Sequence, residues 1–309
     1  METILDWIFI LGGLIGLFLG GEALVRGAVG IARRLAIPPL LIGLTVVGFG
    51  TSTPELLVSV DAALRGVPDI AIGNIIGSNI GNILLIVGLS ALVWPIRVMG
   101  GTLRRDTAVM MAAALALLPL FWMGQVGTLP GAALIAGLIG YLVWAYMQPG
   151  PDTGEVDTSP MLPLWQAALW VAVGLAALML GARFLVDGAV NVARGYGISE
   201  AFIGLTIVAI GTSLPELATS LIAAIRRQSE IAIGNIVGSN IFNVLGILGV
   251  TAVIAPIPVA PRFASFDLPV MIAASALLTA LLLLRPVIGR VAGVGLMLAY
   301  AAYVWSAQG

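Results

Sequence analysis

Long apolar stretches follow one another along almost the whole chain, and short polar segments separate them. A helix that crosses a bilayer needs about 20 mostly apolar residues, and ten stretches approach that length. They cover, approximately, residues 6–30, 40–63, 72–94, 107–123, 128–147, 164–192, 201–224, 233–255, 267–284 and 287–306. This pattern predicts an all-α polytopic membrane protein with ten transmembrane helices.

The longest polar stretch runs from Gln148 to Pro160 and contains three acidic residues among prolines and glycines. We interpret it as a cytoplasmic linker, residues 148–163, between two halves, 1–147 and 164–309. Inward-facing loops of membrane proteins carry an excess of arginine and lysine. With the N-terminus outside, nine arginines fall on inward-facing loops and three on outward-facing loops. We therefore expect a cell-membrane protein with both termini outside.

The two halves repeat one sequence. Residues 43–89 and 204–250, aligned without a gap at a shift of 161, agree at 28 of 47 positions. Because each half holds five predicted spans, an odd number, the second copy must enter the membrane from the opposite side. Two inverted five-helix repeats are typical of secondary transporters, whose substrate site lies near the midplane between the repeats.

The composition removes most enzyme chemistry. Only 9% of the residues are charged, there is no cysteine or histidine, and all 14 basic residues are arginines. Thiol nucleophiles, Ser-His and Ser-Lys dyads and histidine zinc sites are therefore excluded, and we expect no enzyme and no cofactor. A net charge of -1 without a basic patch argues against nucleic acid. The expected partners are inorganic cations and the lipid bilayer, with no obligatory protein partner evident.

Two carboxylates, Glu55 and Glu216, stand inside otherwise apolar spans, in the related segments GTSTPE (50–55) and GTSLPE (211–216). A carboxylate at this depth is costly and is a functional candidate by default. The proline before each glutamate breaks the helix and frees backbone carbonyls, which membranes tolerate only beside a cavity or an ion. The alternatives are a glutamate that reaches the headgroups and a kink used for packing. The duplication of the whole setting argues against both.

Further polar residues follow at helical spacing in both copies. Asn74, Ser78 and Asn82, and likewise Asn235, Ser239 and Asn243, lie four residues apart on one face, beside glycines that favour close helix packing. Thr51, Glu55 and Ser59, and Thr212, Glu216 and Ser220, form a second pair of faces, with Ser52 and Ser213 next to them. If these faces meet, they form an all-oxygen cage suited to calcium or sodium. Simple interhelical hydrogen bonding by the asparagines is the alternative.

A charged pair occurs in the first span of each half, with the signs exchanged. Glu22 and Arg26 are four residues apart, and Arg183 and Asp187 occupy the matching positions. Each pair can neutralise itself as neighbours on one helix face. We favour this structural interpretation over a gate on the ion path.

The segments GTSxPE and GNxxGSNIxN, each present twice, closely resemble the calcium/cation antiporter superfamily, and within it the prokaryotic sodium/calcium exchangers. The resemblance implies that Glu55 and Glu216 are calcium ligands shared with sodium, and that the first and sixth helices slide to alternate access. It implies further ligands for calcium in Thr51, Thr212 and the carbonyls of Gly48 and Ala209, sodium contacts in Ser52, Ser78, Ser213 and Ser239, and central positions for Asn82 and Asn243.

One position departs from the family pattern. Asn243 stands where well-studied exchangers often have aspartate, so the centre has one carboxylate fewer. This leaves the number of sodium ions, a role for potassium, and sodium or proton coupling open. The leading hypothesis is therefore Na+/Ca2+ antiport by alternating access. The alternatives are Ca2+/H+ antiport on the same fold, a passive cation channel and, in last place, a carboxylate-only intramembrane protease.

Overall fold

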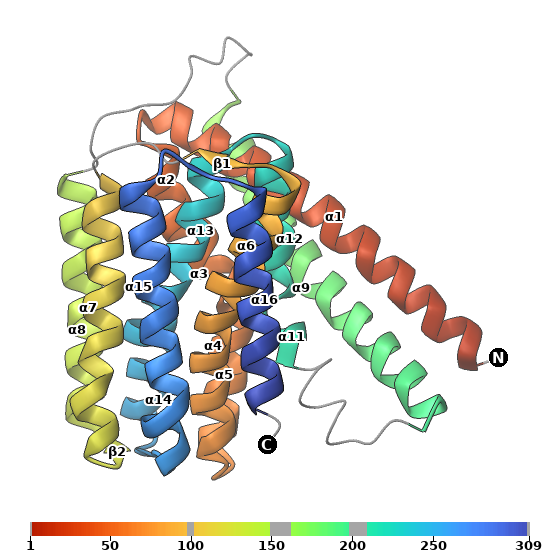
Figure 1. The fold of residues 1–309 in the computed structure, drawn as a ribbon. Helices are drawn as coiled ribbons and strands as arrows, with labels where there is room; N and C mark the ends of the chain where they lie inside the picture. The colour runs from red at the N-terminus through yellow and green to blue at the C-terminus, as the bar shows by residue number, and fades with distance from the viewer. Residues whose placement is uncertain (1, 98–101, 149–161, 198–208, 308–309) are drawn as a thin grey trace.

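The computed structural model describes residues 2–97, 102–148, 162–197 and 209–307, and these ranges form an almost entirely helical bundle (Figure 1). The predicted linker 148–163 and the start of the predicted span 201–224 lie largely outside the described residues.

Two long helices lie side by side and run obliquely to the rest of the bundle: α1 (Glu2–Leu35) and α9 (Leu164–Gly195) (Figure 1). Glycines allow their backbones to touch. A Cβ on Gly20 would lie 2.7 Å from the backbone nitrogen of Leu178, and one on Gly181 would lie 2.7 Å from that of Leu17. Any larger residue there would push the helices apart, so α1 and α9 form one closely packed pair.

The other helices stand more nearly parallel to one another. In the first half they are α2 (Pro39–Ile42), the π-helix η1 (Gly43–Val47), α3 (Gly48–Thr51), α4 (Thr53–Leu64), α5 (Pro68–Gly81), the π-helix η2 (Asn82–Ile86), α6 (Val87–Val93), α7 (Thr102–Trp122) and α8 (Thr128–Met147). In the second half they are α11 (Ala209–Gly211), α12 (Leu214–Ile225), α13 (Ser229–Ile241), the π-helix η4 (Phe242–Leu248), α14 (Gly249–Ile254), the π-helix η5 (Phe263–Asp267), α15 (Leu268–Leu284) and α16 (Arg290–Ala307).

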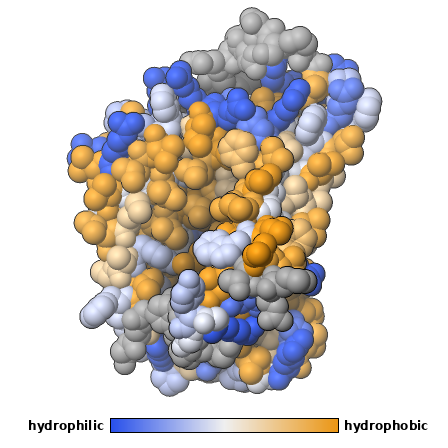
Figure 2. Space-filling model, turned by 90° about the vertical axis from the view of Figure 1, so that its right-hand side faces the viewer, coloured by the Kyte–Doolittle hydropathy of each residue, from blue (hydrophilic) through white to orange (hydrophobic). Residues whose placement is uncertain are grey.

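The prediction of a helical membrane protein is confirmed, although short strands are present, whereas the count of ten spans is not confirmed. Among the described residues, seven helices are long and apolar enough to cross a membrane. Residues Pro39–Thr51 and Thr53–Leu64 make an eighth span if the two helices, bent by 43°, are taken together. Figure 2 shows the corresponding surface, a broad hydrophobic band between hydrophilic residues at the two ends of the molecule.

Two short antiparallel strand pairs join the halves. The strand β1 (Ile96–Arg97) pairs with β4 (Val287–Ile288), and β2 (Gln125–Val126) pairs with β3 (Ile257–Pro258). The positions of β1 and β3 are related by the 161-residue shift, and those of β2 and β4 are related by almost the same shift, 162 residues. Because β1 and β2 lie at opposite ends of the bundle (Figure 1), equivalent loops of the two halves lie at opposite ends as well.

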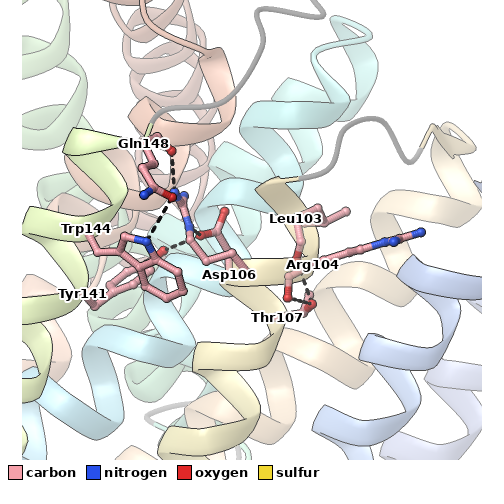
Figure 3. A network of polar contacts seen from close by, with 8 residues as sticks. Leu103, Arg104, Asp106, Thr107, Tyr141, Trp144 and Gln148 are labelled. Carbon is pink, nitrogen blue, oxygen red and sulfur yellow. Dashed lines mark hydrogen bonds and ion pairs between the residues drawn. The ribbon is translucent and has the colours of Figure 1, made fainter.

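A network of polar contacts around the buried carboxylate of Asp106 holds α8 against α7 (Figure 3). Asp106 accepts a hydrogen bond of 2.7 Å from Nε of Arg105 and one of 3.3 Å from the hydroxyl of Tyr141. Arg105 also donates to the backbone oxygen of Gln148, at 2.6 Å. The network therefore holds the C-terminal end of α8 against the N-terminal end of α7.

A related network holds α16 against η5, directly before α15. Its carboxylate, Asp267, lies 161 residues after Asp106. It accepts a hydrogen bond of 3.0 Å from the hydroxyl of Tyr303 and pairs with Arg262 at 3.4 Å. Arg262 donates to the backbone oxygen of Ala307, at the end of α16. The last helix of each half is thus held by the same kind of contact.

Candidate cation-binding site

A break in the helix, repeated in each half, positions the two buried glutamates. The breaks fall at Ser52, between α3 and α4, and at Ser213, before α12. Pro54 and Pro215 occupy the first turn of the following helix, where a missing N–H is tolerated. Glu55 and Glu216 consequently lie in first turns, where the helix dipole favours negative charge. Each is only 1% exposed.

Each carboxylate is held by a serine from the other half. The hydroxyl of Ser52 donates to Oε1 of Glu216 at 2.8 Å, and the hydroxyl of Ser213 donates to Oε1 of Glu55 at 3.2 Å. Ser213 also lies 3.3 Å from the hydroxyl of Ser78. The two helix breaks therefore face each other and bring both carboxylates into one buried polar region.

Two asparagines also form hydrogen bonds between the two breaks. Asn74 donates to the backbone oxygen of Glu55 at 3.0 Å and to Ser59 at 2.9 Å, and its side-chain oxygen lies 3.4 Å from the hydroxyl of Thr212.

Asn235 repeats these contacts in the second half. It donates to the backbone oxygen of Glu216 at 3.3 Å and to Ser220 at 2.8 Å, while Thr51 donates to its side-chain oxygen at 3.1 Å. The expected meeting of the polar faces is therefore present, and the interhelical hydrogen bonding considered for Asn74 and Asn235 is present too.

Asn82 and Asn243 begin or lie within π-helical segments, which often occur at functional sites. The amide nitrogen of Asn82 donates to the side chain of Asn240 at 3.1 Å, and Asn240 in turn lies 3.8 Å from the sulfur of Met110. The side-chain oxygen of Asn82 and both amide atoms of Asn243 are buried without a hydrogen-bond partner among the described residues.

One oxygen of each carboxylate is left without a hydrogen-bond partner among the described residues. These two atoms, Oε2 of Glu55 and Oε2 of Glu216, are buried. Buried polar atoms are nearly always paired, so such exceptions require an explanation. A hard cation satisfies carboxylate, amide and hydroxyl oxygens together. Since the described residues contain no group of three or more acidic ligands, a cation here would depend on two carboxylates and neutral oxygens.

The remaining candidate ligands are placed unequally. The carbonyl of Gly48 accepts hydrogen bonds from the hydroxyls of Ser239, at 3.2 Å, and Thr51, at 3.3 Å, so it is not left free by the helix break. Ala209 begins α11, before the second break. The ligand roles that the resemblance implies for these residues stay predictions.

Close packing by glycine occurs in the second half as expected. A Cβ on Gly234 would lie 2.6 Å from the carbonyl oxygen of Leu40, and one on Gly238 would lie 2.3 Å from that of Leu44. In the first half, a Cβ on Gly77 would meet no atom of the described residues within 4 Å. The expected small-residue packing is therefore present at α13 and not at Gly77 of α5.

Three features of the site's surroundings were not predicted from the sequence. The π-helical segments have no signature in hydrophobic spacing. The second feature is the close glycine packing of α1 against α9, and this feature does have a sequence signature. The glycines recur every seven residues in α1, at 13, 20 and 27, and the same spacing appears 161 residues later, at 174, 181 and 188. The third feature concerns Glu22. It binds Arg226, the residue after α12, while its expected partner Arg26 lies over the ring of Trp170. The expected pair of Arg183 with Asp187 is present at 3.7 Å.

The fold and the site define a polytopic membrane protein with one buried, oxygen-rich polar centre built on two related helix breaks. The family model of the sodium/calcium exchanger protein matches residues 5–147 and 166–307. The chain therefore belongs to the sodium/calcium exchanger family, within the calcium/cation antiporter superfamily.

Relatives and a solved structure agree over nearly the full length. The putative antiporter CaxA of Alkalimonas amylolytica is 44% identical and covers 96% of each chain. The sodium/calcium exchanger MaX1 of Methanosarcina acetivorans is 30% identical and covers 97% of each chain. A structure of the sodium-calcium exchanger NCX_Mj, soaked with Na+ and Sr2+, superposes with a TM-score of 0.87 at 34% identity, covering 98% of this chain and 99% of that one.

Proposed function

We propose that this protein exchanges Ca2+ for Na+ across the membrane by alternating access. Membership of the exchanger family supports antiport of cations. The two transported ions are inferred from the site and from the similarity to MaX1 and NCX_Mj, both of which are named as sodium/calcium exchangers.

The observation that carries the proposal is the pair of buried glutamates, each with one oxygen bound by a serine of the opposite half and one oxygen unused. Two carboxylates balance the charge of one Ca2+. Without a cation, two buried negative charges repel each other and lack solvation. The release of Ca2+ therefore requires replacement by other cations, and this requirement couples the two fluxes.

We assign the ligands as the resemblance implies. Glu55, Glu216, Thr51, Thr212 and the carbonyls of Gly48 and Ala209 would bind Ca2+. Ser52, Ser78, Ser213 and Ser239 would contact Na+, and Asn82 and Asn243 would line the centre. The network of hydrogen bonds between these side chains supports a common site, because a ligand set must be held close together before an ion enters.

The wider architecture belongs to the same proposal. Residues 1–147 and 164–309 would form two inverted five-helix repeats, joined by a cytoplasmic linker over 148–163, with both termini outside. Two observations support inversion: the odd number of predicted spans in each half, and the placement of β1 and β2 at opposite ends of the bundle. Inverted repeats are the usual basis of alternating access.

One observation favours a second candidate, Ca2+/H+ antiport. The central side chains Asn82 and Asn243 are both amides, so the only carboxylates among the assigned ligands are Glu55 and Glu216. Two protons could discharge these glutamates and replace one Ca2+, whereas additional Na+ ions would need neutral ligands.

A flux measurement in proteoliposomes separates the candidates. We expect an outward Na+ gradient, at equal pH on both sides, to drive Ca2+ uptake. Uptake that ignores Na+ and follows a pH gradient would transfer the assignment to Ca2+/H+ antiport. Ca2+ flux without movement of either counter-ion would indicate a passive channel and overturn both.

A further inference from the structure

A two-point ion pair joins the α1/α9 pair to the rest of the bundle. Nε of Arg226 donates to Oε2 of Glu22 at 2.9 Å, and Nη2 of the same arginine donates to Oε1. Arg226 caps the C-terminal end of α12. A bidentate arginine–carboxylate pair is stronger and more directional than an ordinary surface ion pair.

The repeat-related positions cannot form this pair. A shift of 161 residues relates Glu22 to Arg183 and Arg226 to Arg65, so both members of the related pair are positive. Each of these arginines instead has a carboxylate on its own helix. Arg65 lies 2.7 Å from Asp61, and Arg183 lies 3.7 Å from Asp187.

The packing around the ion pair also differs between the two halves. A Cβ on Gly21 of α1 would lie 3.1 Å from Ile222 and 3.3 Å from the backbone of Ala218, both on α12. Ile222 is accordingly only 5% exposed. The position related to Ala218 is Leu57, on α4, and it is 64% exposed.

The position related to Ile222 is Asp61, whose side chain is 59% exposed. Both α4 and α9 are described over their full lengths, and they make no contact comparable with that between α1 and α12. Among the described residues, the α1/α9 pair thus packs more closely on α12 than on the related helix α4, whose Leu57 and Asp61 stay exposed.

We propose that Glu22 and Arg226 form a latch that holds the α1/α9 pair in the arrangement seen here, and that Arg183 and Asp61 form the latch of the opposite arrangement. This inference rests on the proposed alternating access. Inverted repeats that pack unequally imply a second arrangement in which the halves exchange their roles. In it Ala182, related to Gly21, lies against Leu57 and Asp61, and the neighbouring Arg183 exchanges Asp187 for Asp61.

The two latches differ in kind, and this difference biases the equilibrium. In the arrangement seen here Glu22 binds Arg226 through two hydrogen bonds, and Arg26 lies over the ring of Trp170. The Arg183–Asp61 latch requires Arg183 to leave Asp187 and requires Asp61 to leave Arg65. Partly exposed ion pairs change an equilibrium modestly, so removing the first latch should change the ratio of the two arrangements by about two- to tenfold.

Disulfide trapping can report both arrangements without background, because the chain contains no cysteine. Gly21→Cys with Ala218→Cys reports the arrangement seen here, and Leu57→Cys with Ala182→Cys reports the opposite one. Each pair is oxidised in membrane vesicles, with and without Glu22→Gln. Leu57 and Ala182 already carry a Cβ, so their replacement by cysteine should not disturb close backbone packing. If Gly21→Cys impairs folding, the 57–182 pair alone is enough to follow the change between the two arrangements.

We expect Glu22→Gln to lower the 21–218 cross-link and to raise the 57–182 cross-link, and the charge exchange Glu22→Arg with Arg226→Glu to reverse both changes. Asp61→Asn should lower the 57–182 cross-link. The matched control is Asp6→Asn, which also removes a carboxylate from α1, but one whose partner is Asn191 of α9, at 3.0 Å. Since α1 and α9 move together in the proposal, this control should leave both cross-links unchanged.

Equal 57–182 cross-linking with and without Glu22→Gln would overturn the latch, as would an equal effect of Asp6→Asn. Cross-linking does not depend on which ions are carried. A cross-link pattern as expected in a protein without Ca2+ flux would therefore refute the proposed function and leave the latch standing. Normal exchange without any 57–182 cross-link would refute the opposite arrangement.

Discussion

The buried side-chain amide of Asn235 should contribute strongly to the stability of the second helix break. It makes hydrogen bonds to the backbone oxygen of Glu216, to Ser220 and to Thr51, and it is 0% exposed. Asn235→Ala removes all three bonds at a place where water does not replace them. At about 0.5–1.5 kcal/mol for each of the three bonds, the free energy of unfolding should fall by about 1.5–4.5 kcal/mol.

The related variant Asn74→Ala removes the matching bonds, but Asn74 is partly exposed and its contact with Thr212 is longer, at 3.4 Å. Its expected loss is about 1–2 kcal/mol. Asn79→Ala is the control. Asn79 is also buried, at 2% exposure, but it donates its hydrogen bond to the backbone oxygen of Ile75 in its own helix, so a loss of about 1 kcal/mol is expected.

The assay is unfolding by a denaturing detergent in mixed micelles, with Ca2+ affinity measured on the same samples. We expect the order Asn235→Ala, Asn74→Ala, Asn79→Ala in lost stability. Ca2+ affinity should fall severalfold in the first two variants, because both amides hold the turn that carries a glutamate, and stay unchanged in Asn79→Ala. If Asn79→Ala costs as much stability and affinity as Asn235→Ala, the reasoning is wrong.

Three further results are expected. Asp106→Ala should destabilise the protein by about 3–5 kcal/mol, because it breaks a buried ion pair. Asp267→Ala should lower the stability less, because its partner Arg262 is 52% exposed. Unfolding of the two variants in mixed micelles tests the difference. Gly20→Ala should lower the free energy of unfolding by about 1–3 kcal/mol, because the added Cβ overpacks the α1/α9 contact. Gly12→Ala adds a Cβ that meets no atom within 4 Å, so it should not lower the stability. Equal losses in the two variants would show that close packing at Gly20 does not stabilise the helix pair. With both termini outside, a membrane-impermeant thiol reagent added to intact cells should label Arg65→Cys and leave Arg285→Cys unlabelled, and the reverse pattern would invert the orientation.

The sequence was most informative where both halves carry the same chemistry. The duplicated segments at Glu55 and Glu216 predicted two breaks and two polar faces, and hydrogen bonds between the halves join those faces. The breaks lie at Ser52 and Ser213, two residues before each proline, because the proline enters the first turn of the next helix. Repetition reveals such features since both copies must satisfy the same local constraints.

Contacts between different parts of the chain were harder to predict. Glu22 and Arg26 have the spacing of a pair on one helix, yet Glu22 binds Arg226, which is 204 residues away. Local spacing favours the nearer partner, and only the packing of α1 along α12 brings the distant one within reach. The same holds for Asn82, whose partner Asn240 comes from the other half. The π-helical segments also depend on the tertiary fold, because an α-helix and a π-helix have similar apolar patterns over five to seven residues.

The central claim is that Glu55 and Glu216 together bind the transported Ca2+. Its most direct test is Na+-driven Ca2+ uptake by proteoliposomes containing Glu55→Gln or Glu216→Gln, with Asp69→Asn, an exposed carboxylate in the first turn of α5, as the control. We expect either glutamine variant to abolish uptake while remaining folded, and Asp69→Asn to transport normally. Substantial Na+-driven Ca2+ uptake in either glutamine variant would contradict this claim.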